Sequence, residues 1–140
     1  MDFPMPGEVI RYAYLWHSEQ QLGREEAAKD RPCVVILANA DTSQVWVAPI
    51  THAPPLAEDI AIVLPLKTKL RLGLDSDDSW IVLSDLNQFA WAGPDIRIAP
   101  GRSPTTCSYG HLPAALYENI RRKLLDAIQH RAVLTSKRTE

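Results

Sequence analysis

The stretch Arg31–Ala38, RPCVVILA, opens with an arginine and a proline and continues as an apolar run with the β-branched residues Val34, Val35 and Ile36 at its centre. A run of this kind, with proline at its start where a missing donor does little harm, is typical of a buried strand. After the turn-forming residues 39–43, the segment Gln44–Ile50, QVWVAPI, returns as a second strand. The two segments therefore predict a β-hairpin.

Further short strands are expected on both sides of this hairpin, because apolar and β-branched residues gather there between turn-forming residues. The expected strands are Gly7–Trp16, Ile60–Leu64, Ser79–Leu83 and, as a short last strand, Arg97–Ala99. The segment His17–Asp30 between the first two strands is polar throughout and has no apolar stripe to hold it against a core. We predict that it forms a mobile loop.

Helical patterns are found at two places. Pro65–Gly73 is expected to form a short helix, with proline at its start and glycine past its end. A long helix should begin at Pro113, because apolar residues recur every four positions from Leu116 to Ile128. Residues 135–140 are expected to be a frayed tail. The predicted fold class is mainly β (α+β): a small barrel or rolled sheet of about five to seven short strands with a C-terminal helix packed on it.

The composition is that of an ordinary globular protein. The chain has 140 residues, 46% of them hydrophobic and 23% charged, which fits a single domain spanning 1–140. The net charge of −2 does not suggest a general nucleic-acid binder, so any RNA contact should come from a few placed residues. No apolar run is long enough to cross a bilayer, and the first residues lack the features of an export signal. We therefore expect a cytoplasmic protein without a membrane partner.

The pattern of polar residues contains no metal or cofactor motif. The four histidines are scattered and lack ligand spacing, and there is no glycine-rich phosphate loop, so no metal and no cofactor are expected. Three polar residues stand at the ends of apolar strands: Arg31, Thr51 and Asp85. Side chains at strand ends are held by a rigid scaffold and still face solvent, as binding residues often do. The alternative is structural: a surface ion pair for the arginine and turn contacts for the other two.

Several segments, taken in order, resemble the signature segments of the PemK/MazF family of toxins. They are PGEV at 6–9, RPCVVI at 31–36, VAPIT at 47–51 and the later SWIVLSDLNQF, and the similarity covers about residues 6–130. The resemblance implies an SH3-like β-barrel with a C-terminal helix, a homodimer and metal-independent endoribonuclease activity on single-stranded RNA (an mRNA interferase). It also implies a cognate antitoxin, with operator DNA bound only through that antitoxin.

The same resemblance assigns roles to residues of this chain. Arg31 and Thr51 match the catalytic arginine and threonine of the family, and Asp85 lies where many members have an acidic residue. Attack by a ribose 2′-hydroxyl adds negative charge to the phosphate oxygens. The forked, permanently charged guanidinium of an arginine is suited to stabilise that charge. Asp85 would assist proton transfer, with His52 and His17 as the other candidates for the base.

A further RNA contact is expected from Trp91, which precedes a loop and is placed to stack on a base. The chain departs from the family after Asp85, where Leu86–Phe89 replaces the Gln-x-Arg-Thr pattern of many members, and at Leu83, where some members have a basic residue. An alternative function follows from these departures: a catalytically degenerate barrel that binds nucleic acid or protein.

Overall fold

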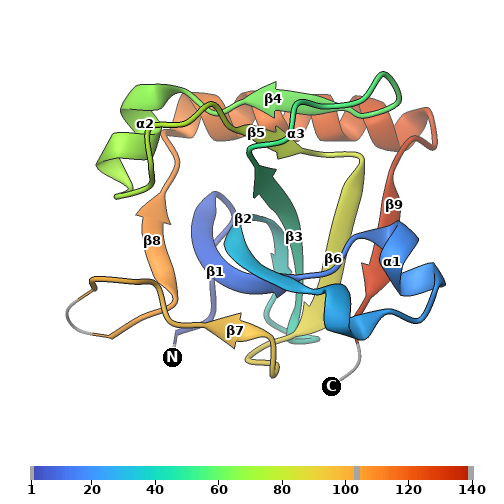
Figure 1. Ribbon diagram of the computed structural model, residues 1–140, viewed down its shortest axis with the longest axis horizontal. Helices are drawn as coiled ribbons and strands as arrows, with labels where there is room; N and C mark the ends of the chain where they lie inside the picture. Colours follow the sequence, from blue (N-terminus) through green and yellow to red (C-terminus); the bar gives the residue numbers. More distant parts are fainter. Residues whose placement is uncertain (1, 103–104, 139–140) are drawn as a thin grey trace.

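The computed structural model of the protein describes residues 2–102 and 105–138, and within these residues the chain is mainly β (Figure 1). The strands are β1 (Glu8–Tyr14), β2 (Lys29–Asn39), β3 (Gln44–Thr51), β4 (Ala61–Val63), β5 (Trp80–Val82), β6 (Asp85–Ala90), β7 (Ile96–Arg97), β8 (Ser108–His111) and β9 (Leu134–Lys137). The helices are α1 (His17–Gln21), the 3₁₀ turn η1 (Glu25–Ala27), α2 (Leu66–Arg71) and α3 (Ala114–Gln129).

All nine described strands join one sheet, whose main path runs β4-β5-β3-β2-β1-β7. β6 pairs with β3 and with β9, and β8 pairs with β1. The pairs are antiparallel except for β6 and β9, which run parallel. The predicted hairpin is confirmed, because β2 and β3 pair through residues 33–39 and 44–49.

The apolar run that identifies β2 is explained by burial on both of its faces. Successive side chains of a strand point to opposite faces of a sheet. Val34 and Ile36 accordingly join one core cluster, and Cys33 and Val35 join the other. All four are almost fully buried, so no polar position interrupts the run.

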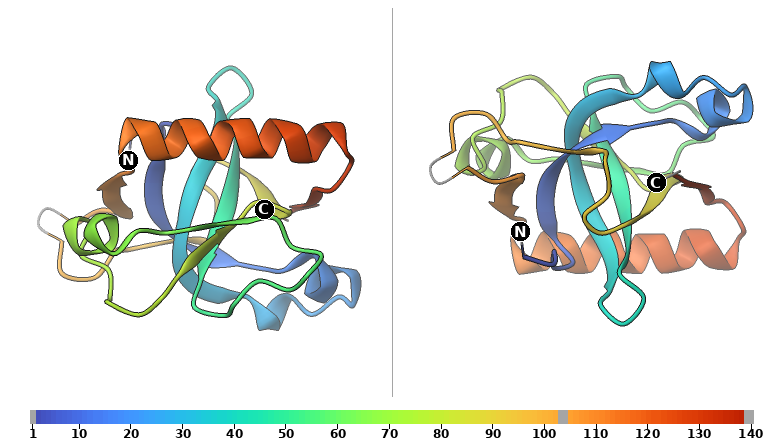
Figure 2. Two further views of the ribbon diagram at one scale, coloured as in Figure 1. Left: turned by 90° about the horizontal axis from the view of Figure 1, so that it is seen from above. Right: turned by 90° about the horizontal axis from the view of Figure 1, so that it is seen from below.

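The helix α3 crosses β1, β2 and β3 and covers one face of the sheet (Figure 2). It buries Ile120, Leu124 and Ala127, as the sequence pattern predicts. Ile128 was expected to continue the stripe, but it is 48% exposed. A spacing of four residues turns about 40° beyond one helical turn at each step, so the apolar row drifts off the buried face.

The structure corrects two parts of the predicted architecture. The described residues form nine strands instead of five to seven, because the segments of β6, β8 and β9 lack a strong apolar pattern. The tail is also not frayed up to residue 138: β9 pairs with β6, and Arg138 is buried. Residues 139–140 lie outside the described residues. Among the described helices, none is both long and apolar enough to cross a membrane.

Candidate functional site

The ends of β2 and β3 form one wall of a cavity of about 260 Å³. In the antiparallel register Cys33 pairs with Pro49, so the chain at Arg31 lies beside the chain at Thr51. Arg31, Thr51 and the following His52 all line this cavity, together with residues of α2 and of the loop after it. Three of the six residues predicted for the site are therefore brought together.

The guanidinium of Arg31 is held beside an aromatic ring. The side chain is half-buried, and its central carbon lies 5.6 Å from the centre of the Trp16 ring. Its buried Nε has no hydrogen-bond partner, and no carboxylate among the described residues forms an ion pair with it. Buried donors in folded proteins are nearly always bonded. A cation placed in this way in a cavity is therefore suited to an anionic ligand.

Thr51 closes β3 and is buried. Its Oγ1 accepts a hydrogen bond from the backbone N–H of Ala53 at 3.1 Å, which fixes the turn after the strand. A threonine hydroxyl can also donate one hydrogen bond. No acceptor within residues 2–102 and 105–138 takes that proton, so it is available to a ligand oxygen beside Arg31.

A charged network that the sequence analysis missed completes the cavity. His52 Nε2 lies 2.9 Å from Asp75 Oδ2, and Lys69 Nζ donates to Asp75 Oδ1 at 2.6 Å. Lys69 is only 2% exposed and also donates to Ser79 Oγ at 2.6 Å and to the backbone oxygen of Asp77. The hydrogen bond from Lys69 is the main cause that lowers the pKa of Asp75 below its usual 3.8.

The same network explains a cluster that resembles a metal site. Ligand atoms of His52, Asp75 and Asp77 lie within 4.8 Å of one another. However, the Lys69 ammonium already bonds to the carboxylate of Asp75 and to the backbone oxygen of Asp77, so a metal cation bound to Asp75 would compete with it. We therefore interpret the cluster as an ion-pair network. The one sequence signal for it was the acidic turn 75–78 after a helix with two lysines.

Asp85 lies on the far side of Thr51. It lines a second cavity, of about 570 Å³, which Thr51 also lines, together with Trp16 and the loop 53–59. Its Oδ1 accepts from the Tyr14 hydroxyl at 2.5 Å, and its Oδ2 accepts from the backbone N–H of His17 at 3.2 Å. Burial raises the pKa of Asp85 despite these hydrogen bonds. The carboxylate thus holds the junction between β1 and α1.

The remaining two residues predicted for the site, His17 and Trp91, lie elsewhere. The imidazole Nδ1 of His17 lies 3.0 Å from Ser136 Oγ, so this side chain is engaged with β9. Trp91 packs against Phe3 and Phe89, with ring centres 6.3 and 6.2 Å apart. Because β6 is antiparallel to β3, Trp91 lies at the opposite end of β3 from Thr51, about 25 Å along the strand.

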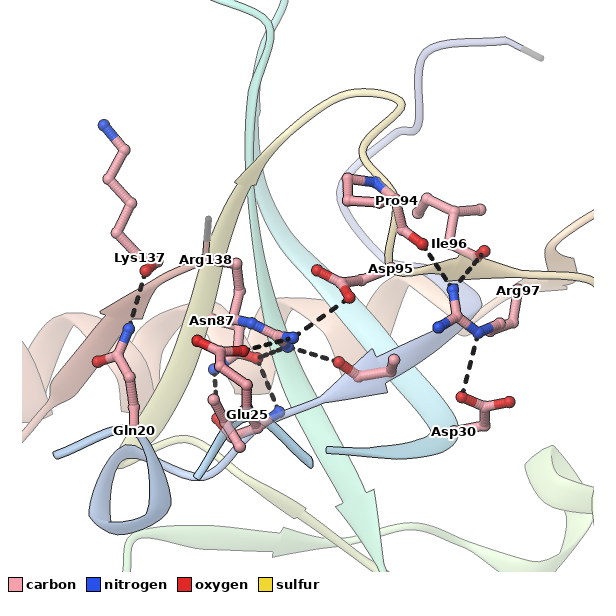
Figure 3. Close-up of polar contacts among 12 residues, drawn as sticks. Gln20, Glu25, Asp30, Asn87, Pro94, Asp95, Ile96, Arg97, Lys137 and Arg138 are labelled. Atoms are coloured by element: carbon pink, nitrogen blue, oxygen red, sulfur yellow. Dashed lines mark hydrogen bonds and ion pairs between the residues drawn. The ribbon is translucent and has the colours of Figure 1, made fainter. Parts of the chain in front are cut away.

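The polar segment before Arg31 is structured, contrary to the predicted mobile loop. It contains α1 and η1, and β2 already begins at Lys29. Polar contacts to the end of the chain hold it: Gln20 Nε2 donates to the Lys137 carbonyl at 2.8 Å, and Glu25 pairs with Arg138 at 3.3 Å (Figure 3). The sequence pattern did not predict this structure because polar contacts, and not an apolar stripe, hold the segment in place.

Comparison of the chain with protein-family models found no match, and comparison with curated proteins found none.

Proposed function

We propose that this protein is a cytoplasmic endoribonuclease of the PemK/MazF toxin type that cleaves single-stranded RNA without a metal. The observation that carries the proposal is the half-buried guanidinium of Arg31, which has no carboxylate partner among the described residues and shares its cavity with Thr51 and His52. The nine-stranded sheet with one C-terminal helix supports the SH3-like barrel that the resemblance implies, and closure of the sheet into such a barrel is part of the proposal.

The chemistry follows from the charge that develops during cleavage. When a ribose 2′-hydroxyl attacks the adjacent phosphorus, negative charge increases on the non-bridging oxygens. Arg31 can bind two of these oxygens through its fork, and its charge does not titrate in the physiological range. Thr51 can donate a hydrogen bond to one of them. Because these side chains are already fixed by Trp16 and by the turn at Ala53, little reorganisation is needed.

A polymeric substrate fits the two adjoining cavities. Thr51 lines both, and Trp16, which contacts Arg31, lines the second cavity together with Pro54 and Pro55. An aromatic and proline-lined cavity next to an anion site can hold a base while Arg31 holds the neighbouring phosphate. Under this proposal Trp16 is the stacking residue near the scissile phosphate, a role that the sequence analysis assigned to Trp91.

The resemblance also supports two proposals about assembly. We propose that the protein forms a homodimer and that a cognate antitoxin protein binds it. A non-catalytic binding module is the second candidate function. It is favoured by one observation: both oxygens of Asp85 already accept hydrogen bonds from Tyr14 and His17.

Cleavage assays with matched substrates test the proposal. Purified protein in excess EDTA should cut a mixed-sequence single-stranded RNA and leave the DNA of the same sequence intact, because DNA lacks the attacking 2′-hydroxyl. The products should carry 2′,3′-cyclic phosphate and 5′-hydroxyl ends. Binding of RNA without any cleavage would favour the binding module, and cleavage that requires a divalent metal would contradict the mechanism.

A further inference from the structure

The network beside the cavity has features of a proton-transfer site. His52 lines the same cavity as Arg31 and Thr51 and directly follows Thr51 in the chain. The other two candidates for the base are less well placed: the carboxylate of Asp85 lines the second cavity and accepts two hydrogen bonds, and His17 contacts Ser136.

The contact with Asp75 determines which nitrogen of His52 can take a proton. An ionised carboxylate only accepts hydrogen bonds, so at 2.9 Å from Asp75 Oδ2 the Nε2 atom must carry the hydrogen. In the neutral imidazole the lone pair then lies on Nδ1. Asp75 thereby selects one tautomer of His52.

The position of Asp75 is itself fixed from a second element. Its Oδ1 accepts from Lys69 Nζ at 2.6 Å and from the backbone N–H of Asp77 at 3.0 Å. Lys69 is buried on α2, and its ammonium is also held by Ser79, which directly precedes β5. The exposed His52 is therefore oriented by a carboxylate that a buried cation holds in place.

We infer that His52 is the general base of the proposed cleavage, positioned through its Nε2–H by Asp75, which Lys69 holds; the inference rests on the proposed function. In the step, Nδ1 of His52 takes the proton of the ribose 2′-hydroxyl as the 2′-oxygen bonds to phosphorus. The bond from phosphorus to the 5′-oxygen breaks, and that oxygen takes a proton from water. The imidazolium then returns its proton to solvent. Asp75 and Lys69 are positioning residues.

The Asp75→Asn variant gives a readout that does not depend on activity. Lys69 donates to Oδ1 of Asp75, so the oxygen of the substituted amide should occupy that position and its NH₂ group should face His52 Nε2. Nε2 must then accept, and the hydrogen moves to Nδ1. We expect ¹⁵N NMR to show the Nε2–H tautomer of His52 in the wild type and the Nδ1–H tautomer in Asp75→Asn. RNA cleavage should fall roughly 100-fold or more, because Nδ1 no longer has a lone pair.

Two further variants complete the test. Asp78→Asn removes the same charge from the same turn, at an exposed residue outside the network, and should change neither the tautomer nor the rate. His52→Gln keeps an N–H group toward Asp75 but has no basic nitrogen, and it should lower cleavage about 100-fold or more. Because His52 is exposed, this second variant should fold even if Asp75→Asn does not.

The outcomes separate the inference from the proposed function. An Nδ1–H tautomer in the wild type, an unchanged tautomer in Asp75→Asn, or wild-type cleavage rates in Asp75→Asn or His52→Gln would overturn the inference alone. Absence of cleavage by the wild type would overturn the proposed function and the role of His52 as base together with it.

Discussion

Replacing Arg138 by methionine should destabilise the protein strongly, although this residue lies close to the end of the chain. The guanidinium, 4% exposed, joins four parts of the structure (Figure 3). Nη1 donates to the Ala13 carbonyl at 2.6 Å and to Asn87 Oδ1 at 3.4 Å. Nη2 pairs with Asp95 at 3.2 Å and with Glu25 at 3.3 Å.

The size of the effect can be worked out contact by contact. Glu25 is 50% exposed, so solvent screens its pair, which contributes about 0–1 kcal/mol. The bond to the buried Ala13 carbonyl has a charged donor and contributes about 1.5–3 kcal/mol. Asp95 is only 15% exposed and would lose its main cation. The first two contributions sum to about 1.5–4 kcal/mol. The uncompensated charge of Asp95 brings the expected loss to about 3–5 kcal/mol, the usual range for breaking a buried pair from one side.

Urea unfolding at pH 7 measures this loss of unfolding free energy. Lys137→Ala changes the exposed residue that directly precedes Arg138, at the end of β9, and is the matched control, with an expected change within about 0.5 kcal/mol. The loss of unfolding free energy in Arg138→Met should become smaller as the pH falls. Burial already raises the pKa of Asp95 while Arg138 opposes that rise, so without the arginine Asp95 protonates more readily and its uncompensated charge disappears. A loss below about 1 kcal/mol at pH 7 would refute the reasoning.

Three other predictions concern the site and the assembly. For Asp75, whose pKa is lowered mainly by Lys69, the stabilisation by the ionised carboxylate is complete above about pH 4 and is lost as the pH falls through its folded-state pKa. Acid titration should therefore show that the stability difference between wild type and Asp75→Asn narrows as the pH falls below about 4; a difference that widens there would contradict the ion pair. Trp16→Ala should weaken RNA binding about 10-fold in a filter or anisotropy assay, whereas Trp91→Ala should not, and equal losses would remove Trp16 from the site. Light scattering should give twice the mass of one 15.7 kDa chain at micromolar concentration, and a single-chain mass would refute the homodimer.

The sequence was sufficient for those parts of the fold that depend on apolar burial. β2, β3 and α3 are recognisable because their buried positions carry apolar side chains. β6 and β9 are not, because they bury Asn87 and Ser136, which are satisfied by distant partners. Asn87, for example, exchanges two hydrogen bonds with the backbone of Leu15, at 3.0 and 2.7 Å.

The residues of the candidate site also divide into those that the sequence could predict and those that it could not. Arg31, Thr51 and His52 could be predicted to lie together because the register of one hairpin joins them. Lys69 and Asp75 could not, because no local pattern indicates that a lysine on a short helix points inward to meet a loop carboxylate. Polar interiors depend on pairings between distant segments, which hydropathy patterns do not record.

The rate at which Arg31→Ala cleaves single-stranded RNA in excess EDTA, relative to the wild type, tests the central claim most directly. Arg31 is the cation assigned to the transition-state charge, so the variant should lose about 100- to 1,000-fold in rate while keeping its fold. Arg122→Ala, an exposed arginine on α3, is the matched control and should cleave as the wild type does. Equal cleavage by Arg31→Ala and wild type would contradict the account.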